Sequence, residues 1–174
     1  DQITNDIAMA LRTPTSEAEE IKIRHGVAMH QMADPEEMIE VPGVGDRPPR
    51  KLSRQALADV IEPRVSELFE LVQAELRRSG YEELLSSGIV LTGGSAVMCG
   101  MAELAEDVFH MPARVGAPQY DGGLADVVCQ PRYSTAMGLV MEGAAQRRRG
   151  LQARDTRSVK QVFGRMKAWF ERNF

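Results

Sequence analysis

Several residue types that would indicate a function class are scarce in this 174-residue chain. Its two cysteines, Cys99 and Cys129, are too few for the disulfide framework of a small secreted domain. Its three histidines, His25, His30 and His110, have no partners at metal-ligand spacing, so we expect no metal site. No apolar run approaches the roughly 18 residues of a membrane-spanning helix, and we expect no signal peptide. We therefore expect a cytoplasmic protein.

Aromatic residues are also few, but they gather at one end of the chain. The segment 158–174 holds the one Trp and three of the five Phe. On a helical projection its apolar residues fall within an arc of about 140°, and its cationic residues lie outside that arc. The apolar face consists of Val159, Val162, Phe163, Met166, Trp169, Phe170 and Phe174, and the cationic residues include Lys160, Arg165 and Lys167. This pattern is typical of a helix that lies in the plane of a lipid surface.

The charge is distributed in the same uneven way. Residues 147–174 carry a net charge of +7, whereas residues 1–146 carry −11. A basic end on an acidic body favours attachment of that end to anionic lipid. Two other interpretations fit the same pattern: the helix binds a groove on a partner protein, or it docks on its own core. Nucleic acid is disfavoured because the aromatic residues lie opposite the cations rather than among them. Residues 147–157 have no apolar periodicity and are predicted to be a flexible basic linker.

The rest of the chain alternates between helical and extended patterns, which favours an α/β fold. Apolar spacing predicts a first helix up to Thr13, and Ser16 and Glu19 form a capping box for a second. Ser53 is expected to cap a helix that Gly80 ends, with Pro63 kinking or dividing it. Its predicted apolar face includes Leu57, Ile61, Val65, Leu68, Leu71 and Val72. We also predict strands at 38–42, 47–52, 88–91 and 111–117, and helices at about 101–109 and 133–145.

A glycine pair follows the third of these strands, which we expect to be buried. Gly93 and Gly94 would let backbone approach a flat or anionic ligand, and the next helical N–H groups would add positive potential. By itself, Gly-Gly after a strand is more often a tight turn. It lacks the glycine spacing of a dinucleotide-binding fold.

The run Gly88-Ile-Val-Leu-Thr-Gly-Gly-Ser-Ala-Val-Met-Cys-Gly100 resembles the adenosine motif of the actin/Hsp70-type ATPases. The whole chain looks like the C-terminal half of the FtsA cell-division family within that superfamily. The resemblance is carried by the segments Ile3-Thr-Asn-Asp-Ile-Ala, Ser16-Glu-Ala-Glu-Glu-Ile-Lys22, Arg47-Pro-Pro-Arg50, Val60-Ile-Glu-Pro-Arg64, Val108-Phe-His110, Tyr133-Ser-Thr-Ala136 and the amphipathic end. It implies an actin-like ATPase fold: one partial lobe (1–15 and 88–146), an inserted α/β subdomain (16–87), the linker (147–157) and a membrane-targeting helix (158–174).

The resemblance also implies half of a nucleotide site. Residues expected to contact adenosine are Gly93, Gly94, Ser95, Met98, Glu19 and Lys22, with Asp1 and Thr4 at the edge of the cleft. Glu19 and Lys22 also fit an ordinary surface ion pair. The family's ATP and Mg²⁺ are bound mainly by phosphate-binding hairpins that lie upstream of this chain. We therefore expect a fragment with no catalytic residues, weak or absent ATP binding and no hydrolysis.

The family's role implies two partners beside the membrane. Full-length relatives bind the C-terminal peptide of FtsZ, self-associate under the control of ATP, and work on the inner face of the plasma membrane at the division site. For the FtsZ peptide we expect Arg54 and Arg64 to meet acidic residues and Leu57 and Ile61 to face apolar ones. The alternatives are a sugar-kinase-like or chaperone-like ATPase of the same superfamily whose tail docks on a protein, and a peptide-binding module without nucleotide.

Overall fold

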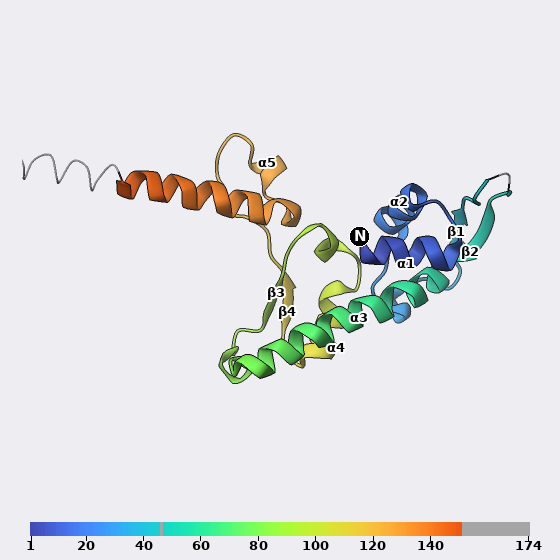
Figure 1. The fold of residues 1–174 in the computed structure, drawn as a ribbon, viewed down its shortest axis with the longest axis horizontal. Helices are drawn as coiled ribbons and strands as arrows, with labels where there is room; N and C mark the ends of the chain where they lie inside the picture. Colours follow the sequence, from blue (N-terminus) through green and yellow to red (C-terminus); the bar gives the residue numbers. More distant parts are fainter. Residues whose placement is uncertain (46, 151–174) are drawn as a thin grey trace, which may run out of the picture. The chain divides into compact units, whose positions relative to one another are not determined.

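The computed structural model describes residues 1–45 and 47–150, which form two units divided after residue 117. The first unit, residues 1–117, contains all four named strands and helices α1 to α4 (Figure 1). Its longer elements are α1 (Gln2–Leu11), α2 (Thr15–His25), β1 (Met38–Val41), β2 (Arg50–Ser53), α3 (Arg54–Ser79), β3 (Ile89–Leu91), α4 (Met101–Phe109) and β4 (Ala113–Val115). Three 3₁₀ turns join them: η1 (His30–Met32), η2 (Glu82–Leu84) and η3 (Gly94–Val97).

Helix α3 is the scaffold of this unit. Ser53 caps its first turn by accepting a hydrogen bond from the Ala56 N–H, and Gly80 ends it in a left-handed conformation with φ 72°. Both termini were predicted from these residue types. The helix is continuous from Arg54 to Ser79, so Pro63 does not divide it.

One hydrophobic cluster joins the helices of this unit around α3. The amino-terminal part of α3 packs against α1, and Arg64 forms an ion pair with Asp6 of α1 at 2.5 Å. Its carboxyl-terminal part packs against α4, where the Phe69 and Phe109 rings lie 5.6 Å apart between centroids. The cluster consists of Ile7, Leu11, Ala18, Ile21, Ala28, Met29, Ile39, Val41, Leu57, Ile61, Val65, Phe69, Met101, Leu104, Ala105 and Phe109. The predicted lobe and insert therefore share a continuous core, although their proposed boundaries stay a prediction.

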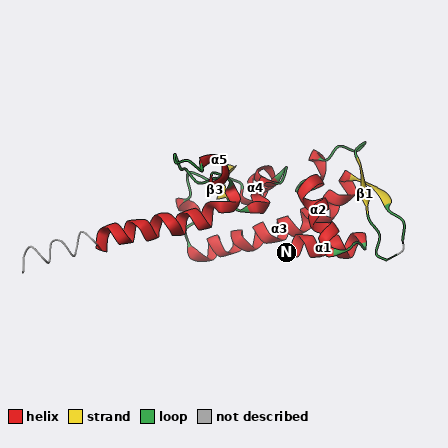
Figure 2. Ribbon diagram, turned by 90° about the horizontal axis from the view of Figure 1, so that it is seen from above, coloured by secondary structure: helices red, strands yellow, loops and turns green. Residues whose placement is uncertain are grey.

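The two short sheets differ in strand direction. β1 and β2 pair antiparallel with Met38 opposite Ser53, and β3 and β4 pair parallel with Ile89 opposite Ala113. Figure 2 shows that helices make up far more of the structure than strands. The burial expected for the strand before the glycine pair is wrong, because Val90 is 51% exposed and Ile89 and Leu91 are only partly buried. A strand in a two-stranded sheet has one covered face at most, so its alternate side chains stay in solvent.

The start of α2 also differs from the prediction. The helix begins at Thr15 with Pro14 at the N-cap position, and no side chain caps it. Ser16 therefore does not form a capping box with Glu19, whose carboxylate turns instead toward α1. The competing interaction is a tertiary one, which the local pattern cannot reveal.

The second unit contains α5 (Ala125–Val128), η4 (Pro131–Tyr133) and a helical stretch over residues 134–150. No residue between 118 and 150 is buried in the described structure. Within this unit, the Cys129 thiol donates to the Tyr120 carbonyl at 3.4 Å, and the Arg132 guanidinium lies 5.9 Å from the centre of the Tyr133 ring. The predicted linker extends beyond the described residues, and the predicted amphipathic helix 158–174 lies wholly outside them.

Candidate functional site

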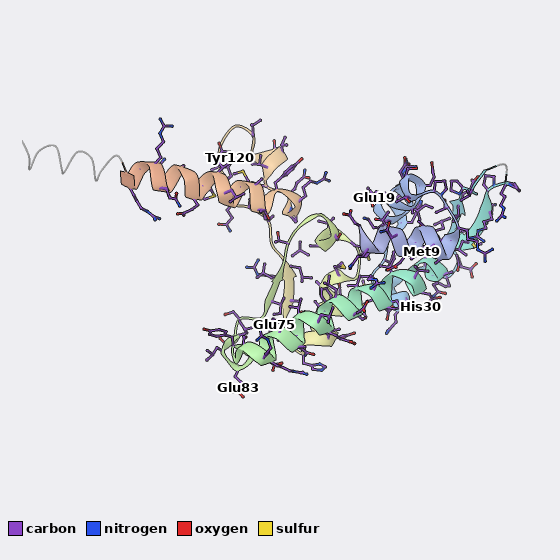
Figure 3. The ribbon with its side chains drawn as sticks, viewed as in Figure 1. Met9, Glu19, His30, Glu75, Glu83 and Tyr120 are labelled. Atoms are coloured by element: carbon purple, nitrogen blue, oxygen red, sulfur yellow. The ribbon has the colours of Figure 1, made fainter. Side chains whose placement is uncertain are left out.

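The candidate nucleotide residues on α2 meet a residue of α1. Lys22 Nζ lies 2.6 Å from Glu19 Oε2 and donates to Thr4 Oγ1 at 2.9 Å. The Thr4 hydroxyl donates in turn to Glu19 Oε2, so the three side chains form a closed cluster. Figure 3 labels Glu19 on α2, next to α1. Only 11% of the Lys22 side chain is exposed, compared with 45% of Glu19. Glu19 is therefore the member of the cluster that a ligand can reach.

The cluster also sets the charge of Glu19. Its bond with the Lys22 ammonium, and then its bond from the Thr4 hydroxyl, hold the pKa of the Glu19 carboxyl below its ordinary value of 4.5. Both bonds favour the ionised form, and they outweigh the partial burial that opposes it. At neutral pH, Glu19 is an acceptor of hydrogen bonds and carries a negative charge.

Met98 lies at the carboxyl-terminal end of α2. A Cβ built on Gly26, which follows α2, would be 3.1 Å from the Met98 terminal methyl and 2.4 Å from the Lys22 carbonyl oxygen. The backbone continues this contact, because the Ala28 N–H donates to the Cys99 carbonyl at 2.8 Å. Only glycine at position 26 permits this close approach. The structure thus brings Met98 to the helix that carries Glu19 and Lys22.

The glycine pair forms a turn into η3. Gly93 has φ 98°, a conformation that favours glycine, and a Cβ there would meet nothing within 4 Å. Ser95 borders a cavity of about 330 Å³ at the amino-terminal end of α1. The other residues that line the cavity are Asp1, Gln2, Ile3, Arg64, Val65, Leu68 and Met101. Ser95 thus shares a cavity with Asp1, and the Glu19–Lys22 pair bonds Thr4, so both groups border the amino-terminal end of α1.

The predicted peptide surface on α3 is not supported. Leu57 and Ile61 are 0% exposed and belong to the hydrophobic cluster, so the expectation that they face a peptide is wrong. Arg54 is bound within the unit by Glu37 at 2.7 Å and by the His25 carbonyl at 3.0 Å. Helical spacing indicates an apolar stripe but not whether a partner or the protein's own core covers it.

Acidic groups line the exposed side of the same helix. A shallow pocket of about 280 Å³ is bordered by His30, Asp59, Glu62, Pro63 and Ser66. His30, labelled in Figure 3, places Nδ1 2.6 Å from Asp59 Oδ1, and its backbone N–H donates to Glu62 at 2.5 Å. Arg64 is paired with both Asp6 and Glu67. This surface therefore presents more acid than base, which disfavours an acidic peptide.

Comparison with known proteins identifies the family. The sequence model of the cell division protein FtsA matches residues 1–138. The chain belongs to the FtsA family. It is 56% identical to FtsA of Pseudomonas aeruginosa over 181 aligned residues, which cover 100% of the chain and 43% of that protein. It is 45% identical to FtsA of Escherichia coli K12, in an alignment that covers 99% of the chain and 43% of that protein. It is 41% identical to FtsA of Bacillus subtilis, in an alignment that covers 80% of the chain and 30% of that protein.

The chain thus spans less than half the length of these FtsA relatives. Solved structures of MreB5 of Spiroplasma citri superimpose with TM-scores of 0.57 for the ADP complex and 0.58 for the AMPPNP complex. The superposition on the ADP complex covers 83% of this chain at 17% sequence identity, and that on the AMPPNP complex covers 84% at 16% identity. Each superposition covers 45% of the MreB5 chain. The actin-like α/β fold is therefore confirmed, and membership of the FtsA family favours a division protein over a sugar-kinase-like or chaperone-like one.

Proposed function

We propose that this chain is the membrane-tethering part of a cell-division adaptor, whose C-terminal segment holds FtsZ filaments at the cytoplasmic face of the inner membrane. Membership of the FtsA family, together with the amphipathic sequence of residues 158–174, carries this proposal. None of the helices within residues 1–45 and 47–150 combines the length and hydropathy needed to cross a bilayer. Attachment through an interfacial helix is the mode that fits the sequence.

The attachment combines two weak forces. Each Lys or Arg near an anionic surface contributes about 1 kcal/mol, and this attraction is screened within a Debye length of about 8 Å at physiological salt. Burial of Trp169, Phe163 and Phe170 adds an apolar contribution that salt does not screen. The result is reversible binding whose strength depends on anionic lipid.

Co-sedimentation with phosphatidylglycerol-containing liposomes tests the tether. We expect the intact chain to pellet, less so at high salt, and a chain ending at Arg157 to stay in solution. Trp169→Ala with Phe170→Ala should also release the chain, whereas the matched change Gln161→Ala, outside the apolar arc, should not. If neither length of chain pellets, the tether proposal fails. The segment then docks on protein, and its aromatic face is the place to look for a partner.

The adaptor would use ATP with Mg²⁺ as a switch for self-association in the full-length protein. In this proposal the adenosine side of that site is formed by Glu19, Lys22, Gly93, Gly94, Ser95 and Met98. We expect the chain alone to bind ATP weakly or not at all and to hydrolyse none. A single-turnover assay with radiolabelled ATP measures this, and release of phosphate by the purified chain would refute it.

The FtsZ tail peptide needs a surface other than the buried side of α3. The β1–β2 hairpin has exposed cations at Arg47 and Lys51 and exposed apolar residues at Met38 and Val44. This combination suits a peptide that carries both acidic and apolar residues. Fluorescence anisotropy with a labelled FtsZ C-terminal peptide should show binding that Arg47→Glu with Lys51→Glu abolishes.

The matched control is Arg114→Glu, which reverses an exposed cation on β4. It should leave the peptide affinity unchanged. Loss of affinity in the control as well would indicate a general charge effect rather than a hairpin site. Undiminished binding by the hairpin variant would exclude this surface, and no binding by the unmodified chain would exclude the peptide as a partner of these residues.

A further inference from the structure

The chain contains one Asp-Gly dipeptide, Asp121-Gly122, and it lies in the loop that leads from β4 to α5. Residues 116–121 have no regular structure, and Tyr120, labelled in Figure 3, precedes the dipeptide. Asp121 is exposed, and its carboxylate forms no hydrogen bond or ion pair within residues 1–45 and 47–150. No contact among these residues therefore keeps the carboxylate from turning toward its own backbone, as aspartate side chains in loops commonly do.

The backbone nitrogen of Gly122 is the group that this carboxylate meets first. Its N–H has no acceptor in the part of the chain that the structure describes, whereas the Gly122 carbonyl accepts from the Ala125 N–H at 3.0 Å. Because glycine has no Cβ, its own side chain does not shield the nitrogen. The structure also explains why glycine stands here, since a Cβ on Gly122 would overlap the Tyr120 hydroxyl. The position of Tyr120 thus requires the residue that makes the dipeptide reactive.

Asp126 shows how the fold protects another exposed aspartate of the same unit. It lies within α5, and the N–H of the next residue, Val127, donates to the Leu124 carbonyl at 3.0 Å. This bond and the branched Cβ of valine keep the nitrogen from the Asp126 carboxyl. The two aspartates therefore differ in the access of each carboxyl to the nitrogen that follows it.

The arrangement at Asp121 favours a covalent rearrangement. The Gly122 nitrogen attacks Cγ of the protonated Asp121 carboxyl, and the new C–N bond closes a five-membered succinimide ring. One carboxyl oxygen leaves as water, which carries away the amide hydrogen and the carboxyl hydrogen. Addition of water to the other ring carbonyl opens the ring to isoaspartate, in which the main chain runs through the former side chain. No atom is oxidised or reduced. We propose that Asp121-Gly122 is an isoaspartate-forming site of this protein.

The product differs from aspartate in two ways that a partner can recognise. The main chain becomes one atom longer between Tyr120 and Gly122, whose carbonyls accept bonds from Cys129 and Ala125. The former α-carboxyl then projects from the exposed loop as a carboxylate. The partner that fits this group is a methyltransferase that uses S-adenosylmethionine. It transfers a methyl group to a carboxylate oxygen and releases S-adenosylhomocysteine. Attack of the Gly122 nitrogen on the ester expels methanol and returns the succinimide, so the modification is repairable.

Ageing of the purified full chain in neutral buffer tests the proposal. Trypsin releases residues 115–132 as one peptide, which holds both Asp121 and the matched control Asp126. Endoproteinase Asp-N cleaves before aspartate but not before isoaspartate. We expect a progressive loss of cleavage before residue 121 and undiminished cleavage before residue 126. Electron-transfer fragmentation should locate isoaspartate at position 121, and isoaspartyl methyltransferase with tritiated S-adenosylmethionine should label the aged chain.

Two further samples separate the contribution of the fold from that of the dipeptide. Asp121→Glu keeps the charge but needs a six-membered ring, so the aged variant should carry no methyl label at this position. A synthetic peptide of residues 115–132 has the dipeptide without the rest of the chain. The intact chain should lose cleavage at residue 121 as the peptide does, because no described contact restrains the Asp121 carboxylate.

Three outcomes would overturn the proposal or part of it. If the peptide isomerises and the intact chain does not, the loop holds Asp121 away from the Gly122 nitrogen and the proposal is wrong. Equal loss of cleavage at residues 121 and 126 would show general ageing, which refutes a site built by this loop. Isoaspartate that the methyltransferase fails to label in the folded chain would exclude the proposed partner, while the rearrangement itself would stand.

Discussion

Replacing Leu57 by alanine distinguishes core from binding surface on α3. Leu57 is 0% exposed, whereas Leu71 on the same helix is 64% exposed. The two Leu→Ala changes remove the same atoms from the same kind of helix interior, so their effects on helix propensity cancel. The difference between the variants therefore measures burial alone.

The expected magnitude follows from the atoms removed. Leu→Ala deletes three carbon atoms, and at about 0.8 kcal/mol for each buried methylene the lost transfer free energy is about 2.4 kcal/mol. The cavity left in a close-packed cluster raises the total cost to about 3–5 kcal/mol. This is a large part of the roughly 5–15 kcal/mol by which a typical domain is stable. The change at Leu71, largely in solvent, should cost less than about 0.5 kcal/mol.

Urea denaturation followed by circular dichroism at 222 nm measures both variants. We expect the midpoint to fall sharply for Leu57→Ala and to stay near that of the unmodified chain for Leu71→Ala. If Leu57→Ala were as stable as the unmodified chain and instead lost affinity for the FtsZ peptide, Leu57 would be a surface residue. That result would refute the packing described for α3.

Three further predictions concern polar contacts, each measured by urea denaturation. Ser53→Ala removes the cap of α3 and should cost about 1 kcal/mol. Gln73→Met removes the 2.7 Å bond from Gln73 to the Val108 carbonyl and should also cost about 1 kcal/mol. Glu19→Gln should remove a pH-dependent contribution to stability. Because the pKa of Glu19 is lowered in the folded state, its contribution is present above pH 4.5 and is lost as the pH falls through the folded value.

Each of these three has a control of the same residue type. Ser66→Ala, within α3, should not destabilise, and Gln55→Met, whose bond to the Ala33 carbonyl is 3.4 Å long, should cost less than Gln73→Met. Glu20 pairs with Arg24, and both side chains are more than half exposed. Glu20→Gln should therefore lose stability on acidification to the same extent as the unmodified chain. Equal effects in control and test variants would contradict the assigned contacts.

Local signals in the sequence determined the ends of several elements. Ser53 and Gly80 bound α3 because an N-cap hydroxyl and a left-handed C-terminal residue act on their own backbone neighbourhood. The predicted helix at about 101–109 coincides with α4, Met101–Phe109, and the strand at 38–42 contains β1. Family-specific segments also sufficed for the actin-like fold, now supported by the superposition on MreB5.

Tertiary packing decided which apolar residues are core. The periodicity of α3 places Leu57, Ile61, Leu68 and Leu71 on neighbouring parts of its surface, yet only the first two are buried. Gln2 of α1 and Leu68 line the same cavity, so the amino-terminal end of α1 lies beside Leu68. Farther along α3, α4 packs on the side that carries Phe69 and Gln73, and the side that carries Leu68 and Leu71 is left exposed. Helical spacing within α3 carries no information about where another helix ends.

The candidate site shows the same division between local and tertiary information. Spacing placed Glu19 and Lys22 on one face of α2, and their ion pair at 2.6 Å follows from that spacing. The partner that orients them, Thr4, is 15 residues from Glu19 and lies on another helix. Its role arises only when α1 and α2 pack together, because a hydrogen bond between distant residues depends on their positions in space and leaves no periodic signal in the sequence.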